Sequence, residues 1–346
     1  MQLHQASPAR RVLIGQGALQ ELAAEVSRGG GGRVVLVASA TLRAQTTLVD
    51  RVVAELEGHH LATFSEVGEH TPLSAVAQLQ DLLEQTAADC VVSFGGGSVI
   101  DGVKAAIHQR GVDGILHVAV PTTLSGAEFT PTAGVTEDET RLKRGLRDPA
   151  AAPAIVLLDP EVTLSTPERL WLSSGIRALD HAVETQWAPE GDPLAGLLVR
   201  AAIPKLLSAL PSCRRDPDDL VARHEAQLGA WWAATGLAGS TMGPSHQLGR
   251  LLGATFQVPH GITSCVFLPA TLEWQLDRDR SLVDLLCEPF AVRSPEEVVA
   301  ACRRFITGLG LPTDLAGAGL DPGAVVRFLQ MAPPEWHPIV ERAGRG

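Results

Sequence analysis

The sequence contains no run of about 18 apolar residues, the shortest length that crosses a bilayer as a helix. Its first residues, Met1 to His4, do not begin the charged-then-apolar pattern of a secretory signal. Lys and Arg form no cluster as large as those on nucleic-acid-binding surfaces. The formal net charge of -11 also repels the phosphate backbone of a nucleic acid. We therefore expect a soluble cytoplasmic protein without a membrane or nucleic-acid partner.

Cysteine is sparse and scattered along the chain. Five cysteines are present, an odd number, and no two of them have C-x-x-C spacing. They are Cys90, Cys213, Cys265, Cys287 and Cys302. This pattern argues against a disulfide framework and against a zinc ribbon, so we expect free, buried thiols.

The sequence does contain enough apolar material for two domains. With 346 residues, 45% of them hydrophobic, the chain can bury a large core. Up to about residue 160, β-branched runs alternate with helical patterns, which is typical of βαβ units and a parallel sheet; beyond it, long amphipathic helices prevail. The sequence therefore predicts an α/β domain over residues 1–160 and an all-α domain over residues 161–346. The clearest predicted strands are 33–39, 90–94 and 116–121, and the clearest predicted helices are 48–56, 73–83, 178–183, 197–210 and 224–235.

A glycine-rich segment, Gly95-Gly96-Gly97-Ser98, follows the second of these strands and precedes a predicted helix. Glycine permits a tight turn and leaves backbone amides bare, so a pyrophosphate could bind at the helix N-terminus. Taken alone, the segment is equally compatible with a plain turn between a strand and a helix.

The wider pattern around these glycines is more specific. Residues 95–104 match Gly-Gly-Gly-Ser-x-x-Asp-x-x-x, with Asp101 at the seventh position and Lys104 at the tenth. Residues 121–131 then read Pro-Thr-Thr-Leu-Ser-Gly-Ala-Glu-Phe-Thr-Pro. Both segments resemble cofactor signatures of the iron-type alcohol dehydrogenases, and the second is most similar to that of the maleylacetate reductases within this group. The resemblance extends from about residue 10 to about residue 275.

The resemblance implies a dehydroquinate synthase-like fold, in which a Rossmann-like dinucleotide-binding domain precedes a helical substrate domain, and it suggests a homodimer. It also implies NADH or NADPH as the cofactor. Ser39 ends the first predicted strand where an acidic side chain would bind an adenosine 2′-hydroxyl, so both nucleotides stay open. The residues assigned to the cofactor are Gly95, Gly96, Gly97, Ser98, Asp101, Lys104, Thr122, Thr123, Ser125, Lys143 and Ser39.

The positions that match the family's metal ligands differ in one residue. Metal-using members have one aspartate and three histidines there, whereas this chain has Arg177, His181, His246 and His260. A guanidinium stays protonated and only donates hydrogen bonds, so Arg177 cannot coordinate a metal. Maleylacetate reductases also lack this aspartate and, by the resemblance, work without metal, so we expect a metal-independent site. A rearranged site of Asp180 with the three histidines stays open, although Asp180 points about 100° away from His181 on a helix.

A second departure is Arg250, which replaces a histidine that the family keeps four residues after the position of His246. Arginine can bind a carboxylate or stabilise an oxyanion, but it does not carry protons near neutral pH. We therefore predict hydride transfer from a nicotinamide to a small, carboxylate-bearing carbonyl or enone. Arg177 and Arg250 would bind this anionic substrate. The proton would come from His246, His260 or His181.

The same residues allow other interpretations. Arg177 and Arg250 could lie on the surface of an arginine-rich chain, and His181 could be a core histidine. The altered positions could also serve a redox-neutral lyase or cyclase in a biosynthetic pathway, which would consume no NAD(P)H. A catalytically inactive binding subunit is a third interpretation, against which the intact segment 95–104 argues.

Overall fold

The computed structural model describes residues 9–68, 71–110, 114–139, 142–187, 193–238 and 242–345. The chain divides into two compact units between Thr166 and Pro167. The first unit combines strands and helices, and the described part of the second unit is helical. The predicted class, α/β followed by all-α, is confirmed.

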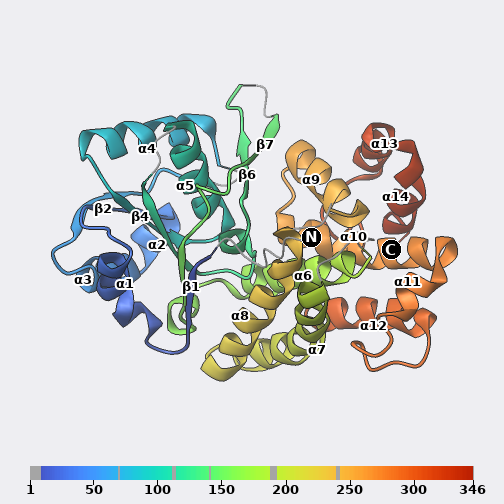
Figure 1. Ribbon diagram of the computed structural model, residues 1–346. Helices are drawn as coiled ribbons and strands as arrows, with labels where there is room; N and C mark the ends of the chain where they lie inside the picture. The colour runs from blue at the N-terminus through green and yellow to red at the C-terminus, as the bar shows by residue number, and fades with distance from the viewer. Residues whose placement is uncertain are drawn as a thin grey trace. The chain divides into compact units, whose positions relative to one another are not determined.

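One parallel sheet of six strands forms the centre of the first unit (Figure 1). The strand order across it is β1-β8-β5-β4-β2-β3. The strands are β1 (Arg11–Ile14), β2 (Val34–Ala38), β3 (His60–Phe64), β4 (Cys90–Gly95), β5 (Leu116–Pro121) and β8 (Ile155–Leu158). Because β4 and β5 are parallel neighbours and Gly95 pairs with Pro121, the loops that follow these two strands lie beside each other.

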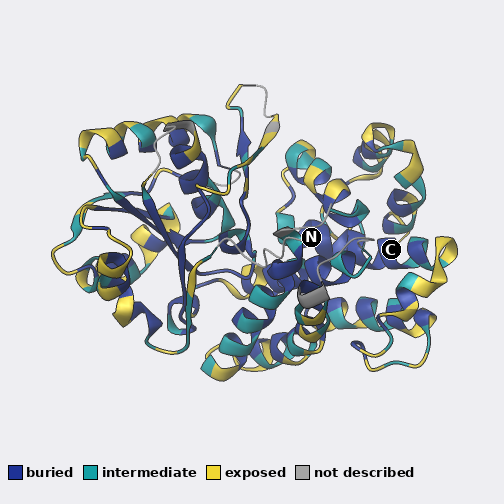
Figure 2. Cartoon of the chain, viewed as in Figure 1, coloured by how far each residue is buried: buried dark blue, intermediate teal, exposed yellow. Residues whose placement is uncertain are grey.

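Both faces of the sheet are covered by helices. Val34, Leu36 and Ala38 of β2 belong to an apolar cluster with α1 and α3, whereas Val35 and Val37 belong to a second cluster with α4 and α5. Alternate side chains of a strand point to opposite faces, so a strand buried on both sides is apolar throughout. Figure 2 shows these strands as buried. The helices of this unit are α1 (Leu22–Arg28), α2 (Ala40–Gln45), α3 (Leu48–Glu55), α4 (Leu73–Gln85) and α5 (Gly97–Arg110).

The three predicted strands are confirmed as β2, β4 and β5, and the predicted helices over 48–56 and 73–83 as α3 and α4. Strands β1, β3 and β8 were not predicted from the sequence. An antiparallel hairpin of β6 (Thr132–Thr136) and β7 (Lys143–Arg147) was not predicted either. β1 and β8 have only four residues each, which is too short for a periodic pattern.

The second unit is organised around α6 (Glu168–Thr185) and α10 (His260–Arg278). α6 packs against α7, α8 and α10, and α10 packs against α9, α12 and α14. The predicted helices over 178–183, 197–210 and 224–235 are confirmed as parts of α6, α7 and α8. The remaining helices are α7 (Pro193–Arg215), α8 (Leu220–Thr235), α9 (Pro244–Phe256), α11 (Arg280–Asp284), α12 (Pro295–Gly308), α13 (Pro322–Met331) and α14 (His337–Ala343).

One helix, α7, is long and apolar enough over Ala195–Arg215 to cross a membrane by length and composition alone. It carries four charged residues, Arg200, Lys205, Arg214 and Arg215, and it packs against α6 and α8. Core helices of soluble proteins pass the same test. The segment is therefore weak support for a membrane span.

Candidate active site and cofactor site

The glycine loop, Gly95–Gly97, joins the end of β4 to the start of α5. Gly95 has φ +155°, a conformation that L side chains rarely adopt. A Cβ on Gly96 would lie 3.1 Å from Cγ2 of Thr123, and a Cβ on Gly97 would lie 3.0 Å from Oγ of Ser125. The loop after β5 thus packs directly on bare backbone at a helix N-terminus, an arrangement suited to a phosphate group.

Thr122 and Thr123 are buried beside the glycine loop. The amide of Thr122 donates to the carbonyl oxygen of Gly95 at 2.9 Å and aligns the two loops. Oγ1 of Thr123 has no hydrogen-bond partner among the described residues. Leaving a buried hydroxyl unpaired costs about 1–3 kcal/mol, which an oxygen of a bound ligand would offset. At the start of α5, the carbonyl oxygen of Ser98 accepts from Oγ1 of Thr71 at 3.1 Å.

Lys104 and Asp101, which we expected to contact the cofactor, are engaged within the protein. Lys104 is fully buried, and its Nζ donates to the carbonyl oxygens of Ala127 at 2.8 Å and Thr132 at 2.5 Å. The same Nζ lies 3.0 Å from Oδ1 of Asp101, whose Oδ2 accepts from the amide of Gly134 at 3.1 Å. Because an ammonium has three donors, Lys104 positions the segment after β5 and has no donor left for a cofactor. The assignment of Lys104 to the cofactor stays a prediction, and the contacts of this side chain indicate an indirect role.

Ser39 and Lys143 lie at the edges of the first unit's predicted site. Ser39 caps α2, since its Oγ accepts from the amide of Leu42 at 3.2 Å. Nearby, Nη1 of Arg43 donates to Oγ of Ser65 at 3.5 Å. Lys143 begins β7, and its side chain lies outside the described residues.

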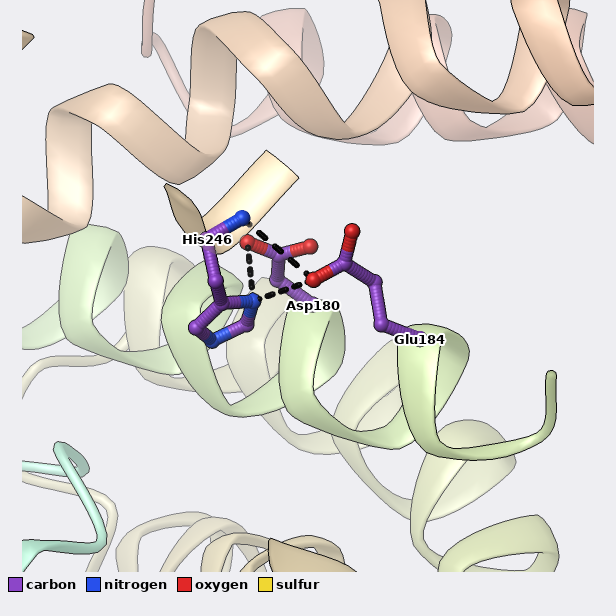
Figure 3. A group of neighbouring side chains, drawn as sticks. All are labelled: Asp180, Glu184 and His246. Carbon is purple, nitrogen blue, oxygen red and sulfur yellow. Dashed lines mark hydrogen bonds and ion pairs between the residues drawn. The ribbon is translucent and has the colours of Figure 1, made fainter. Parts of the chain in front are cut away.

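In the second unit, four side chains of α6 share one face. Arg177, Asp180, His181 and Glu184 follow the i, i+3, i+4, i+7 spacing that aligns side chains along a helix. Asp180, His181 and Glu184 are buried, and Arg177 is partly exposed. Asp180 and Glu184 turn toward His246, in the first turn of α9 (Figure 3). The structure thus brings three predicted residues, Arg177, His181 and His246, together with two carboxylates.

Glu184 connects α6 to the beginning of α9. Its Oε1 accepts from the amide of Ser245 at 2.7 Å, and its Oε2 accepts from the amide of His246 at 3.3 Å. These amides belong to the first turn of α9 and have no partner within that helix. Oε2 also lies 2.6 Å from Nδ1 of His246. Gly243 allows this approach, because a Cβ there would lie 2.4 Å from Oε1.

Asp180 joins the same group from one turn earlier on α6. Its Oδ2 accepts from Oγ of Ser245 at 2.9 Å and lies 3.4 Å from Nδ1 of His246. Nη1 of Arg177 donates to Oγ of Ser264 on α10 at 3.1 Å. Among the residues that the structure describes, Asp180, Glu184 and His246 are the one group spaced closely enough to hold a metal ion. His181 and His260, which belong to the rearranged metal site that the sequence left open, are not part of this group.

The imidazole rings of His181 and His246 stack, with centroids 4.6 Å apart and planes inclined by 25°. Nε2 of His246 is buried and has no hydrogen-bond partner among the described residues, and the same holds for Nδ1 of His181. A narrow pocket adjoins both rings. It is lined by His181, Glu184, Thr185, Leu237, Met242, Gly243 and His246.

Burial controls the acid–base properties of this cluster. Loss of hydration raises the pKa of the Glu184 and Asp180 carboxyl groups and lowers the pKa of the His246 and His181 rings. The positive charge of Arg177 further lowers the pKa of both histidines. The cluster therefore favours uncharged histidines beside one permanent cation.

The other two predicted residues lie close to the cluster. Arg250 is exposed on α9, and its charge lowers the pKa of both His246 and Arg177. His260 is the first residue of α10, and its Cε1 would lie 3.3 Å from a Cβ placed on Gly253 of α9. Arg250 is thus accessible to a solute, whereas His260 lies against α9.

The helices that carry these residues approach very closely. A Cβ on Gly261 of α10 would lie 2.6 Å from the backbone carbonyl carbon of Ser173 on α6. Real Cβ atoms essentially never come so close to backbone atoms, so a side chain at this position would force the two helices apart. Gly261 thus sets the distance between α6 and the N-terminus of α10.

Two family models match the chain. One, described as iron-containing alcohol dehydrogenase, matches residues 9–160, and the other, the C-terminal part of the same family, matches residues 171–335. A maleylacetate reductase from Burkholderia cepacia is 32% identical over 323 residues, which are 93% of this chain and 88% of that relative. The chain belongs to the iron-containing alcohol dehydrogenase family. Maleylacetate reductase 2 from Cupriavidus pinatubonensis is 35% identical over 75% of this chain and 70% of that relative.

Solved structures of this family have the same fold. A maleylacetate reductase from Agrobacterium tumefaciens superimposes with a TM-score of 0.88 at 28% identity, covering 99% of both chains. A putative alcohol dehydrogenase from Ralstonia eutropha gives a TM-score of 0.90 at 28% identity, covering 99% of this chain and 96% of that one. The resemblance inferred from the glycine and proline-threonine segments is confirmed.

Glu184, which makes two hydrogen-bond contacts with His246, was not among the predicted site residues. A signal was available, because Glu184 follows Asp180 by four residues and Arg177 by seven on one predicted helix. The contact with α9, by contrast, depends on how two helices pack. The spacing of residues along the sequence does not indicate which helices pack together.

Proposed function

We propose that this family member uses NADH or NADPH to reduce a small, carboxylate-bearing carbonyl or enone, and that it does so without a metal. The curated relatives named maleylacetate reductase, about 30% identical over most of the chain, support a reductase of this kind. We further propose that the enzyme is a cytoplasmic homodimer. The observation that supports a carboxylate-bearing substrate is the position of Arg177, whose positive charge lies beside the buried cluster of Asp180, His181, Glu184 and His246.

The first unit offers a fitting place for the dinucleotide. Side chains at Gly96 and Gly97 would crowd the loop after β5, and the buried Oγ1 of Thr123 lacks a partner among the described residues. These features would hold phosphate oxygens, with Thr122 and Ser125 keeping the neighbouring loop in place. The bound nicotinamide supplies the hydride.

The second unit offers groups for an anionic substrate. Arg177 and Arg250 both lie close enough to His246 for their charges to lower its pKa, so an anion that they bind would lie near that ring. A guanidinium binds a carboxylate through two parallel hydrogen bonds and stabilises negative charge that develops on an oxygen. A histidine of the cluster would then deliver the proton.

The same geometry argues for metal independence. Nδ1 of His246 lies 2.6 Å from a carboxylate oxygen of Glu184, a hydrogen-bond distance that leaves no space for an ion between the two atoms. Both oxygens of Glu184 already accept from backbone amides. Arg177 would also repel a dication, just as it lowers the pKa of both histidines. These three features support our proposal that the site works without a metal.

Nucleotide binding tests the proposal first. Metal-stripped protein is titrated with NADH and with NADPH, by nucleotide fluorescence, with and without added zinc or iron. We expect tight binding of at least one nucleotide that needs no metal and that Gly96→Asp abolishes, because its carboxylate repels phosphates. Gly58→Asp serves as the control, since Gly58 is exposed with open space around it. A wild-type protein that binds neither nucleotide would overturn the proposal.

Substrate class is tested by NADH or NADPH oxidation with maleylacetate, simple 2- and 3-oxo acids, and their neutral ester analogues. We expect turnover of the acids and at least tenfold less of the esters, because the esters lack the charge that pairs with Arg177 and Arg250. Arg250→Met should raise KM for the acid by about tenfold or more, whereas Arg304→Met, at an exposed position on α12, should not. Equal turnover of acids and esters would exclude this substrate class.

A further inference from the structure

We propose that Glu184 and His246 act as one acid, in which Glu184 positions the ring and shares a hydrogen with Nδ1 so that the Nε2 hydrogen meets the substrate. This inference rests on the proposed reductase function. It selects His246 among the three candidate histidines and adds a positioning residue.

The hydrogen-bond arrangement fixes what can lie between the two side chains. Nδ1 of His246 faces two carboxylate oxygens, Oε2 of Glu184 at 2.6 Å and Oδ2 of Asp180 at 3.4 Å. Without a hydrogen on that side, the lone pair of Nδ1 would point at both oxygens, which is repulsive. A hydrogen therefore lies between Nδ1 and Oε2, on either atom.

The orientation of the ring follows from the same bonds. Oε2 of Glu184 also accepts from the backbone amide of His246, so one oxygen holds both the backbone and the ring of that residue. Nε2 then lies on the far side of the ring from the two carboxylates (Figure 3). It is buried without a partner among the described residues, and His246 is one of the residues that line the narrow pocket. A buried nitrogen without a partner at a pocket is a position for a ligand atom.

The proton balance is simple. Before reaction the pair holds two hydrogens, the shared one and the one on Nε2, and it has no net charge. The bond between Nε2 and its hydrogen breaks, and the proton binds to the substrate atom that has gained negative charge. The remaining hydrogen stays on Nδ1, Glu184 is left as a carboxylate, and water later returns a proton to Nε2. No oxidant or reductant enters this step.

The surroundings of His246 support a neutral starting pair. On α6 it faces Arg177, Asp180 and His181 as well as Glu184, and Arg250 lies on its own helix. The positive charge of Arg177 and the negative charge of Asp180 offset each other. A Glu184–His246 pair without net charge therefore adds no charge to the buried site.

The test has a spectroscopic readout that needs neither cofactor nor substrate. Nδ1 of His246 and Oε2 of Glu184 are 2.6 Å apart and shielded from water. In a proton NMR spectrum, a hydrogen between them gives a resonance far downfield of the backbone amides. We expect this resonance in the full-length wild-type protein and its loss in both Glu184→Gln and His246→Gln. Glu25→Gln is the matched control, because Glu25 is a buried glutamate that pairs with Arg11 and Arg28 in the first unit.

Kinetics separates positioning from a purely structural role. Glutamine at 184 keeps an oxygen for the amide of Ser245 but presents a donor where Oε2 faces Nδ1. We expect kcat to fall about 100-fold or more, with KM within about threefold of wild type. A missing resonance, a resonance that survives in Glu184→Gln, or an unchanged kcat would overturn the inference. If the wild-type protein reduces no acid, the proposed function fails, while the resonance still decides whether Glu184 and His246 share a hydrogen.

Discussion

Gly243 and Glu184 lie so close together that a Cβ on the glycine would stand 2.4 Å from Oε1 of the carboxylate. An alanine at this position must therefore displace the carboxylate or the start of α9. Either movement lengthens the bonds from Glu184 to the amides of Ser245 and His246.

We predict that Gly243→Ala lowers the free energy of unfolding by about 1–3 kcal/mol, as overpacking of a buried site does. It should also lower reductase activity at least tenfold. Urea denaturation and NAD(P)H oxidation measure the two effects. Gly308→Ala is the control, because Gly308 is exposed at the end of α12 with open space around it. Wild-type stability and activity in Gly243→Ala would contradict the close approach.

Lys104 should be essential for the stability of the first unit. Lys104→Met leaves the carboxylate of Asp101 and the carbonyl oxygens of Ala127 and Thr132 without their cation. The carbonyl oxygens left without a donor cost about 1–3 kcal/mol, and the loss of the pair with the partly exposed Asp101 adds to this. Urea denaturation followed by far-ultraviolet circular dichroism checks this value.

Lys205→Met is the matched control for Lys104→Met. Lys205 is only partly buried, and it pairs with Glu225 and lies 5.0 Å from the ring centre of Trp232. Its loss should cost about 1 kcal/mol or less, as for other partly exposed pairs. Equal losses in the two variants would mean that the buried ammonium of Lys104 contributes little.

His117 should make the first unit sensitive to acid. It is buried between Oγ of Ser93 at 2.9 Å and the carbonyl oxygen of Ala151 at 3.1 Å, and burial lowers its pKa to about 3. Because the folded pKa lies below the unfolded value of about 6.5, the neutral ring's stability is fully present above pH 6.5. This stability is lost as the pH falls toward 3. The loss amounts to about 3 kcal/mol at pH 4.

The corresponding variant is His117→Gln, which has no ring to protonate. We expect it to be less stable than wild type at pH 7.5, yet to lose less stability between pH 6.5 and pH 4. Urea denaturation at a series of pH values measures both slopes. Parallel slopes would show that another group causes the acid sensitivity.

Metal removal should leave the enzyme active. Dialysis against a chelator should change NAD(P)H oxidation by less than twofold, and elemental analysis should find well under one zinc or iron per chain. Arg177→Asp replaces the cation with the carboxylate that metal-using relatives have, so it should gain affinity for a divalent ion. One metal per wild-type chain, with activity lost on chelation, would refute metal independence.

The first unit was largely predictable because its central strands are buried on both faces. β2, β4 and β5 each have six or fewer residues and are buried throughout, so they stand out as apolar runs. β6 and β7 form a separate two-stranded sheet, and their polar residues give no such run. Pairing between distant segments decides whether such short, polar stretches form strands, and a single sequence does not show it.

The candidate site was predictable in its residues but not in its contacts. The helix spacing correctly indicated that Arg177 and His181 share a face with each other. The 100° separation of Asp180 from His181 suggested that the carboxylate turns away from the histidines. Instead, α9 approaches that side of α6, and Asp180 meets His246 and Ser245. Tertiary packing, rather than position along one helix, determined the neighbours of Asp180.

The contact between Gly261 and the backbone of Ser173 fixes the spacing of two helices that carry site residues, independently of the site side chains. Two backbones in contact hold α6 and α10 at a distance that does not depend on the side chains at 177, 181 and 260. We therefore expect the spacing of α6 and α10 to persist when those side chains are exchanged. One substitution could then replace a metal ligand with an arginine while the helices around it stay in place. In this fold, either a bound metal ion or an arginine side chain could supply the positive charge of the site.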